Sequence, residues 1–326
     1  MGAINTVSDR CGEVALDPRI PRILDAVNGV VRGKPEVVRQ AVVTLLAGGH
    51  LLIEDVPGVG KTTLGRALAR AMGGEFRRVQ FTADLLPADI LGVSVFDSGE
   101  RAFRFRPGPV FAHVLLADEI NRSTPRTQGA LLQAMEEHQV TLDGTTHALP
   151  DPFFVIATQN PIEHHGTFPL PESQLDRFLL RVAMGYPERE AEIELIADRD
   201  RSAGAESIEA VITPGALSDA RRGVRGVRID PALVDYLLRI VEATRAHDAL
   251  ALGASPRAGL SLGRAARASA YLDGRGYVVP DDVKAWAEPV LAHRLVPRDA
   301  GAGPAADRET VRGALAEVLR RIPVPL

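Results

Sequence analysis

The chain has 326 residues, of which 45% are hydrophobic and 25% are charged, and this composition excludes an intrinsically disordered or fibrous protein. Its length suggests two domains of ordinary size. The formal net charge is −4, so the overall balance gives no reason to expect binding to nucleic-acid phosphates. Cys11 is the only cysteine, which excludes a disulfide within the chain and zinc sites built from cysteines.

Uninterrupted apolar stretches reach only about ten residues, well below the length that spans a membrane. The N-terminal 21 residues carry polar and charged side chains throughout and lack an apolar signal core. We therefore expect a cytoplasmic protein with no membrane span.

Periodicity divides the chain into segments. Residues 1–17 show no pattern and are interpreted as a flexible tail, whereas residues 21–47 carry apolar side chains at helical spacing with a break at 29–35. Beyond them, strand and helix signals alternate: strands are predicted at 50–54, 77–81, 114–117, 153–158 and 179–184, and helices at 62–72, 84–91, 128–137 and 172–178. This alternation predicts an α/β fold with a parallel sheet covered by helices on both faces.

Two stretches depart from the alternation. The segments 93–105 and 139–149 alternate apolar and polar residues around Asp97-Ser98-Gly99 and Asp143-Gly144, which predicts two hairpins inserted into the α/β core. After residue 187 the strand signals end, and helices are predicted at 191–197, 231–246, 260–272, 281–293 and 308–321. We therefore predict an α/β domain over 18–187 and a small all-α domain over 188–326.

The segment that follows the first strand has the features of a phosphate-binding P-loop. In such a loop main-chain amides bind phosphates, Lys61 contacts the β- and γ-phosphates, and the hydroxyl of Thr62 binds Mg²⁺. Asp55 replaces the first glycine of the usual pattern, and aspartate tolerates the left-handed backbone that glycine adopts. The predicted nucleotide contacts are Pro57, Gly58, Val59, Gly60, Lys61, Thr62 and Thr63.

Two further polar sites follow buried strands. Asp118 and Glu119 end the strand at 114–117, at the edge where open α/β sheets bind ligands. We predict that Asp118 holds Mg²⁺ through water and that Glu119 orients and deprotonates the attacking water. Asn160 can hydrogen-bond that water and the γ-phosphate, although an asparagine before a proline is also a common turn residue. Because the chain has no Asn-Lys-x-Asp motif for guanine, ATP is expected rather than GTP.

In these motifs and in four longer strings, the chain resembles the MoxR family of AAA+ ATPases over residues 23–322. The resemblance is carried by four strings, Leu116-Ala-Asp-Glu-Ile-Asn-Arg122, Ala157-Thr-Gln-Asn-Pro-Ile-Glu-His164, Phe168-Pro-Leu-Pro-Glu172 and Gln174-Leu-Asp-Arg-Phe178. It implies a P-loop AAA+ sheet between helices, followed by a helical lid. It also implies that Asp55 is a usual variant and that the hairpins are the helix-2 and pre-sensor-1 inserts of this clade.

The resemblance implies residue roles as well. Lys61 and Thr62 would be the Walker A pair, and Asp118 and Glu119 the Walker B pair. Asn160 would be sensor 1. Arg177 looks like the arginine finger supplied to the neighbouring subunit's nucleotide, although taken alone it could be a surface arginine paired with Asp176 or Glu172. Arg257 looks like sensor 2, which reaches from the lid to the γ-phosphate. Adenine would lie near Val30, Val31 and Gly33.

Two other clusters receive plainer interpretations. Glu163, His164 and His165 look like metal ligands, but adjacent histidines on a loop rarely converge on one ion, so no metal site is expected there. The run Arg221-Arg222-Gly223-Val224-Arg225 is interpreted as a solvated turn rather than a partner site.

By resemblance we expect an Mg²⁺-dependent ATPase that forms a ring, a hexamer, and remodels or matures partner protein complexes. The clients of MoxR relatives often carry a von Willebrand factor A domain, and the outcome includes metal or cofactor insertion. One alternative is a nucleic-acid motor, which would need basic hairpin tips. The tip at Asp143-Gly144 has none, and Arg101, Arg104 and Arg106 of the other hairpin face Asp97 and Glu100, so no nucleic-acid partner is expected. A second alternative is a nucleotide-gated scaffold.

Overall fold

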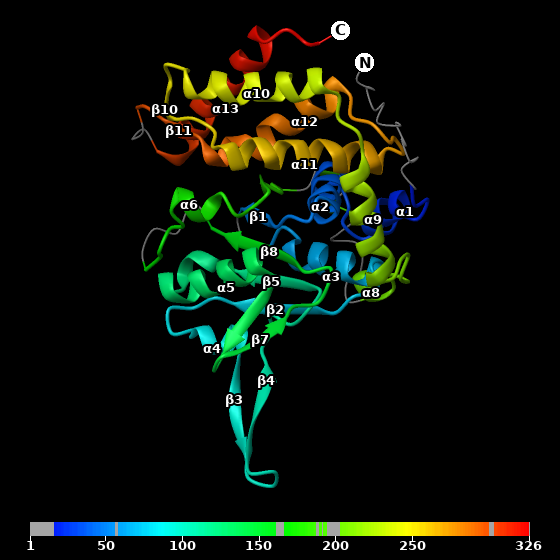
Figure 1. Cartoon of the computed structure of the whole chain (residues 1–326), viewed down its shortest axis with the longest axis vertical. Helices are drawn as coiled ribbons and strands as arrows, with labels where there is room; N and C mark the ends of the chain where they lie inside the picture. Colours follow the sequence, from blue (N-terminus) through cyan, green and yellow to red (C-terminus); the bar gives the residue numbers. More distant parts are fainter. Residues whose placement is uncertain are drawn as a thin grey trace, which may run out of the picture.

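The computed structural model describes residues 16–55, 58–160, 166–186, 189–190, 192–193, 203–299 and 303–325. Five parallel strands form its central sheet, in the order β2-β5-β8-β1-β9 (Figure 1). The strands are β1 (Leu51–Glu54), β2 (Phe76–Gln80), β5 (Val114–Asp118), β8 (Phe154–Gln159) and β9 (Leu180–Val182). The predicted α/β fold with a parallel sheet is confirmed.

The inner strands β1, β5 and β8 bury both of their faces, whereas most of β2 at the edge is exposed. Side chains alternate along a strand, so Leu116 belongs to one apolar core and its neighbour Leu115 to another. The first core includes helices α1 (Ile20–Asn28), α2 (Pro35–Leu46) and α3 (Lys61–Ala71), and the second includes α4 (Pro87–Leu91) and α5 (Pro125–Glu137). Continuous apolar strands are therefore the pattern that this sheet requires. The short helix η1 (Ile120–Arg122) follows β5, and α6 (Glu172–Leu175) precedes β9.

The second half of the chain is mainly helical and lies at one end of the sheet (Figure 1). Its helices are α8 (Ala203–Glu206), α9 (Pro214–Gly226), α10 (Pro231–Arg245), α11 (Pro256–Leu272), α12 (Pro280–Leu291), η2 (Ala292–Arg294) and α13 (Pro304–Arg321). Three of them begin in the same way, because a polar side chain accepts a first-turn amide hydrogen bond immediately before a proline: Thr213, Asp230 and Ser255. Caps of this kind stabilise a helix by about 1 kcal/mol.

One buried arginine fixes this helical lid to the sheet. Helix α11 packs against α2, and the side chain of Arg294 is only 3% exposed. Its guanidinium donates to the carboxylate of Asp176 at 2.6 Å and to the carbonyls of Phe178 at 2.6 Å and Leu179 at 3.2 Å. A buried charge is tolerated when it is paired in this way, so the lid is anchored to the segment that leads into β9.

The lid departs from the sequence-based prediction in two places. It is not entirely helical, because β10 (Leu250–Leu252) and β11 (Val296–Pro297) pair antiparallel, and strands this short leave no readable alternation. The run 221–225 is not a turn but part of α9, and the side chain of Arg221 is only 12% exposed. Gly223 lets α9 approach α11 closely, since a Cβ there would lie 3.0 Å from the Tyr271 ring.

Several expectations fall on residues outside the described ranges. They include most of the tail at 1–17, most of the helix at 191–197, the division at 187–188, and the cluster Glu163, His164 and His165. Among the described helices, none is both long enough and apolar enough to cross a membrane.

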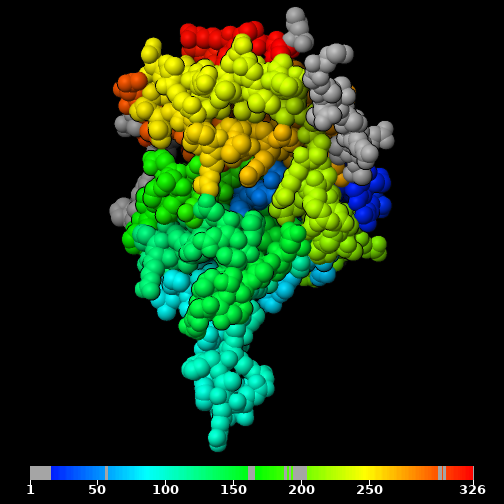
Figure 2. Space-filling model, in the orientation of Figure 1, coloured from blue at the N-terminus to red at the C-terminus, as the bar shows by residue number. Residues whose placement is uncertain are grey.

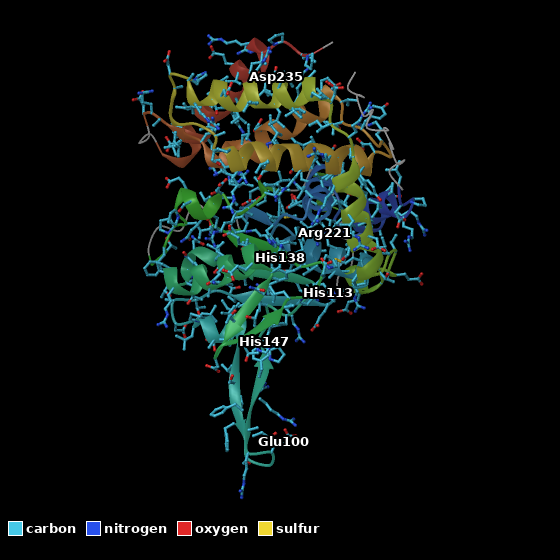
Figure 3. All side chains as sticks on the ribbon, viewed as in Figure 1. Glu100, His113, His138, His147, Arg221 and Asp235 are labelled. Carbon is cyan, nitrogen blue, oxygen red and sulfur yellow. The ribbon has the colours of Figure 1, made fainter. Side chains whose placement is uncertain are left out.

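Two hairpins extend from the side of the molecule opposite the lid (Figures 1 and 2). The first is β3 (Gly92–Asp97) with β4 (Ala102–Pro107), and the second is β6 (Gln139–Leu142) with β7 (Thr145–Ala148). Glu100 lies near the far end of the first, whereas Asp235 marks the opposite end of the molecule on α10 (Figure 3). The rings of Phe105 and His147 stack with centroids 3.9 Å apart, so the two hairpins are in direct contact.

His50 directly precedes β1, and its buried side chain contacts the backbone of strand β8 and helix α5. Its Nδ1 accepts the Val155 amide at 3.0 Å, and its Nε2 lies 3.2 Å from the Met135 carbonyl, to which it donates. Burial, together with the nearby His138 and Arg221 charges, lowers the pKa of His50 from 6.5 to about 3. The neutral imidazole is therefore part of the folded core.

We predict that stability falls as the pH drops from 6.5 towards 3, because unfolded His50 binds a proton that folded His50 does not. The contribution of one such group is at most about 1.4 kcal/mol per pH unit. The variant His50→Asn keeps an acceptor near the Val155 amide and does not titrate. Urea unfolding at about pH 7 and about pH 5 should give a shallower pH dependence for it, with about 1–3 kcal/mol less stability at neutral pH.

His293 is also buried, and burial and the neighbouring arginines lower its pKa. It contributes equally to the pH dependence of stability in His50→Asn and in the parent chain, so it does not affect the comparison. An identical pH dependence in His50→Asn and the parent chain would contradict the prediction.

Candidate functional site

The loop between β1 and α3 has the backbone of a phosphate-binding turn. Gly58 and Gly60 have φ values of 86° and 100°, in the left-handed region that glycine adopts without a steric penalty. Helix α3 begins at Lys61, directly after Gly60. The amides of its first turn have no acceptor within the helix and can bind an anion at this end. Val56 and Pro57 lie outside the described residues.

Asp55 has a different role from the one expected at this position. It is not among the described residues with positive φ, so tolerance of a left-handed backbone does not explain it. Its carboxylate accepts a hydrogen bond from the amide of Gly185, and its carbonyl accepts one from Lys61 Nζ at 2.7 Å. The aspartate therefore ties the start of the loop to the segment that follows β9.

Lys61 is held in a mixed environment. Burial lowers the pKa of its ammonium group, whereas the carboxylates of Asp118, Asp55 and Glu119 raise it. A bound phosphate would favour the charged form further. The lysine is thus placed to bind an anion.

A single hydroxyl fixes both carboxylates at the end of β5. Thr158, on the neighbouring strand β8, donates from Oγ1 to Asp118 Oδ1 at 2.6 Å and accepts the Glu119 amide at 2.8 Å. The residue is completely buried. Thr158 therefore sets the relative positions of Asp118 and Glu119.

The backbone and side chain of Glu119 are both constrained. Its φ and ψ are 56° and 50°, a left-handed conformation that costs a non-glycine residue about 1 kcal/mol. Its Oε2 accepts hydrogen bonds from Gln80 at 2.7 Å and from Arg122 at 3.1 Å. The carboxylate is thus held by β2 on one side and by η1 on the other.

The oxygen atoms of Thr62 and Asp118 suit the magnesium ion that accompanies ATP. Hydroxyl and carboxylate oxygens are the ligands that Mg²⁺ prefers, and both residues line one cavity. The second carboxylate oxygen of Asp118 accepts a charge-assisted hydrogen bond from Arg78 at 2.6 Å. The donor set therefore fits the ion.

These side chains line a cavity of about 300 Å³ at the carboxyl edge of the sheet. It brings together eight of the predicted residues, namely Gly58, Gly60, Lys61, Thr62, Thr63, Asp118, Glu119 and Asn160. Arg78 and Gln80 also line it, and neither was predicted, because nothing near β2 in the sequence marks them. Val59 instead packs against the apolar core.

The predicted adenine contacts do not line this cavity. Val30, Val31 and Gly33 belong to the connection between α1 and α2, and Val31 is buried in the core at 6% exposure. At the end of that connection Lys34 donates to the carbonyl of Tyr186 at 2.5 Å. The connection therefore lies near the segment that contacts Asp55.

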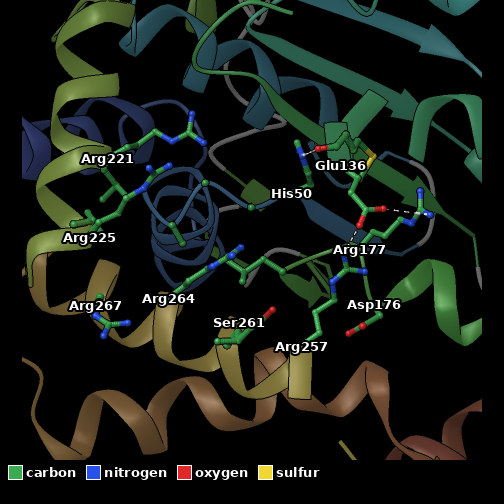
Figure 4. A pocket seen from close by; sticks show the side chains of 18 of the residues that line it. His50, Glu136, Asp176, Arg177, Arg221, Arg225, Arg257, Ser261, Arg264 and Arg267 are labelled. Carbon is green, nitrogen blue, oxygen red and sulfur yellow. Dashed lines mark hydrogen bonds and ion pairs between the residues drawn. The ribbon is translucent and has the colours of Figure 1, made fainter. Parts of the chain in front are cut away.

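Arg177 and Arg257 lie at the opposite, amino edge of the sheet. Both form ion pairs with Glu136 at the end of α5, Arg177 at 3.3 Å and Arg257 more closely. They line a second cavity of about 680 Å³ between the lid and the residues that precede β1 and β9 (Figure 4). We call it the arginine cavity after its seven arginines: Arg177, Arg221, Arg225, Arg257, Arg264, Arg267 and Arg294.

The two cavities share no lining residue, so this chain does not bring Arg177 or Arg257 to its own Lys61. The partner of Arg177 is also not Asp176 or Glu172 but Glu136, a residue that no sequence pattern singles out. The two arginines predicted to act on phosphate therefore stand together, at a distance from the phosphate-binding loop.

Glu54 connects the loop to the far end of the lid. This last residue of β1 accepts hydrogen bonds from Gln159 at 2.7 Å and from Arg308 of α13 at 2.8 Å, and Arg181 of β9 is 3.7 Å away. Gln159 directly precedes Asn160. A single carboxylate thus joins β1, β8 and the lid beside the nucleotide-binding edge.

A P-loop at the carboxyl edge of a parallel sheet, two carboxylates at the end of β5 and a helical lid define an ATPase domain of the AAA+ type. Residues 50–180 match the ATPase family associated with various cellular activities (AAA), and residues 242–315 match the AAA lid domain. A presumed ATPase from Cytophaga hutchinsonii has a solved structure that is 35% identical, with a TM-score of 0.85 over 94% of this chain and 95% of that one.

Curated relatives make the assignment narrower. The chain is 47% identical to the uncharacterized protein YeaC of Bacillus subtilis, over 86% of this chain and 88% of the relative. It is 43% identical to chaperone MoxR1 of Mycobacterium tuberculosis over 85% and 75%, and 36% identical to protein MoxR of Paracoccus denitrificans over 83% and 86%. The chain belongs to the MoxR family of AAA+ ATPases, a family whose members bind nucleotide.

We predict that Thr158→Val lowers kcat for ATP hydrolysis about 10- to 100-fold, because neither Asp118 nor Glu119 keeps its hydroxyl partner. ATP binding by calorimetry should change little, since the phosphate-binding loop is intact. Thr158→Ser, which retains the hydroxyl, is the matched control and should keep most of the activity. Equal activity in the valine and serine variants would show that the hydroxyl is not needed.

Proposed function

We propose that this MoxR-family ATPase assembles head-to-tail into a closed ring, a hexamer, and hydrolyses ATP at the contacts between subunits. The observation that carries the proposal is the separation of Lys61 from Arg177 and Arg257 on opposite edges of one sheet. A head-to-tail contact places the amino edge of one subunit on the carboxyl edge of the next. Each complete site would then need two chains.

In the proposed reaction the phosphates bind the amides that begin α3, and Lys61 leaves the Asp55 carbonyl to contact the β- and γ-phosphates. Glu119 accepts the proton of the attacking water, which Asn160 helps to orient. As the terminal phosphoryl group transfers to water and ADP departs as the leaving group, Arg177 and Arg257 of the neighbouring chain stabilise the developing charge. Thr62, and Asp118 through water, would hold Mg²⁺, which would supply neutralisation of phosphate charge.

Glu136 holds both arginines in the isolated chain. Its carboxylate forms ion pairs with Arg177 and Arg257, and the side-chain hydrogen bond from Arg257 is the main cause of the lowered pKa of Glu136. The arginines must leave Glu136 to reach a phosphate. The proposed ATPase is therefore slow as separate subunits and faster once assembled.

We further propose that the ring remodels or matures partner protein complexes, including proteins with a von Willebrand factor A domain and steps of metal or cofactor insertion. The name of a relative, chaperone MoxR1, supports a protein client. The β3–β4 hairpin offers a contact surface, since Phe96 and Phe103 are 55% and 73% exposed. A nucleic-acid motor is less well supported, because Arg104 pairs with both Glu100 and Asp97 on that hairpin.

We predict that Arg177→Ala lowers kcat by about 10³-fold or more, the range expected for an arginine finger. Binding of ATP to the isolated chain should remain unchanged, because Arg177 is not part of the Lys61 cavity. Arg126→Ala, on the exposed start of α5, is the matched control and should retain normal turnover. ATPase activity per chain should also rise with protein concentration. If Arg177→Ala hydrolyses ATP normally at high concentration, hydrolysis between subunits is disproved.

We also predict that Glu119→Gln binds ATP without turning it over and holds a client in a long-lived complex. Lys61→Ala, which cannot bind the nucleotide, is the control and should retain no client. Affinity capture with both variants in the presence of ATP, followed by mass spectrometry, measures the difference. A nucleic acid recovered in place of a protein, or a partner retained equally by both variants, would argue against the remodelling function.

A further inference from the structure

The arginine cavity carries much more positive charge than its own carboxylates neutralise. Its lining includes seven arginines but only two carboxylates among the described residues, Glu136 and Asp176. Two arginines, Arg177 and Arg257, have a place in the proposed reaction. The remaining five are not accounted for by that role.

Most of these arginines have partners within the chain. Five guanidinium groups contact a carboxylate or carbonyl, namely Arg177 and Arg257 with Glu136, Arg221 with Asp151, Arg267 with Val227, and Arg294 with Asp176. Arg225 and Arg264 make no hydrogen bond or ion pair with any residue in the described part of the chain. Each brings a full charge and five unused donors into a shared space.

Two lid helices direct these side chains to the same place. Arg221 and Arg225 are one turn apart on α9, and Arg257 and Arg264 are two turns apart on α11, so each pair lies on one face of its helix. Figure 4 shows Arg225 and Arg264 extending into the space between the lid and the start of β1. The cavity is therefore built from arginines of two separate helices.

The floor of the cavity also makes room for them. Gly48 and Gly49 precede β1, and a Cβ on Gly48 would lie 2.7 Å from a terminal nitrogen of Arg221. Gly48 has a φ of 69°, which glycine adopts readily. Burial, the neighbouring Arg225 charge and the pull of Asp151 act together on Arg221, and burial, the largest of them, lowers its pKa. The charge of Arg225 is thus held close to that of Arg221, whose only carboxylate partner among the described residues is Asp151.

We propose that the arginine cavity is a binding site for a compact phosphate-bearing anion, with Arg225 and Arg264 as its unoccupied contacts. Planar guanidinium forks match phosphate oxygens in pairs, and a volume of about 680 Å³ falls within the range of small-molecule sites. The phosphates could come from a free molecule or from ATP held by a second copy of the chain. The second source rests on the proposed function, whereas the first does not.

The binding test uses sodium tripolyphosphate as the probe and the full chain carrying Lys61→Ala, which disables the phosphate-binding loop. Calorimetry at low salt should detect binding at the arginine cavity. Adding Arg225→Ala and Arg264→Ala together should weaken it about 100-fold, roughly tenfold for each lost charge-assisted contact. Arg225→Lys should be intermediate, because it keeps the charge but loses the fork.

A matched control separates a built site from general positive charge. Arg222 is on the same helix as Arg225, but it pairs with Asp219, is 68% exposed and does not line the cavity. Arg222→Ala should leave tripolyphosphate binding unchanged. If it weakens binding as much as Arg225→Ala, the anion senses only net charge and the proposal fails. Binding of polyglutamate, with no binding of tripolyphosphate, in the same assay would also overturn it, in favour of an acidic peptide.

A second measurement identifies the source of the phosphates. With Lys61 intact, ATP hydrolysis is measured for Arg264→Ala at high protein concentration, with and without tripolyphosphate. A raised KM for ATP or a lower kcat without tripolyphosphate supports the second copy as the source. Unaltered hydrolysis, together with tripolyphosphate binding that Arg264→Ala abolishes, supports a free anion.

Absence of both effects disproves the site. The proposed function is tested separately by Arg177→Ala, so a normal response of Arg177→Ala would discredit head-to-tail hydrolysis without touching tripolyphosphate binding. Loss of activity in Arg177→Ala, with no effect of Arg225→Ala or Arg264→Ala in either assay, would leave the ring intact and reject the anion site.

Discussion

The parallel pairing of β1, β5 and β8 is the constraint on which the rest of the molecule depends. All carboxyl ends of these strands lie at one edge, so the loop after β1, Asp118 at the end of β5 and Asn160 after β8 meet there. All amino ends lie at the other edge, where His50 and Leu179 border the arginine cavity. The two faces are closed by apolar cores, which leaves only the edges for polar chemistry.

The lid contacts both edges of this sheet. At the carboxyl edge Arg308 of α13 binds Glu54, one residue before the loop, and at the amino edge Arg257 of α11 pairs with Glu136. Arg294 anchors the lid between these two points. A change at the nucleotide that moves β1 relative to β8 therefore has a direct route to the lid through Glu54. The same lid carries Arg257, which the proposed head-to-tail contact would present to the neighbouring subunit's nucleotide.

The sequence made the carboxyl edge predictable because its signals are local. A buried strand followed by glycines and a lysine, or by two carboxylates, specifies a site within a few residues. The supporting contacts are not local. Gln80 is on β2 and Glu119 follows β5, while Thr158 and Asp118 are on different strands, so no single segment contains both members of either pair.

The separation of contacting residues along the chain also explains where the sequence-based predictions were wrong. Asp55 was interpreted through its backbone, but its carboxylate binds Gly185, which is distant in sequence. The arginine run of α9 looked like a turn because Gly223 interrupts it, yet that glycine is where Tyr271 packs. Strands β10 and β11 are three and two residues long, too short for periodicity to register. In each case the decisive neighbour lies far along the chain.

The proposed division of one catalytic centre between opposite edges of a sheet would have a genetic consequence. In the proposed ring, a chain damaged at Lys61 would still present intact Arg177 to the next subunit, and a chain damaged at Arg177 would still bind its own ATP. Within a proposed mixed ring, defects at different edges can complement each other, whereas defects at the same edge cannot. A copy without Arg177 also leaves the healthy neighbour's site incomplete, whereas a copy without Lys61 loses only its own site. The edge on which a mutation falls, more than its severity, then decides whether it is dominant.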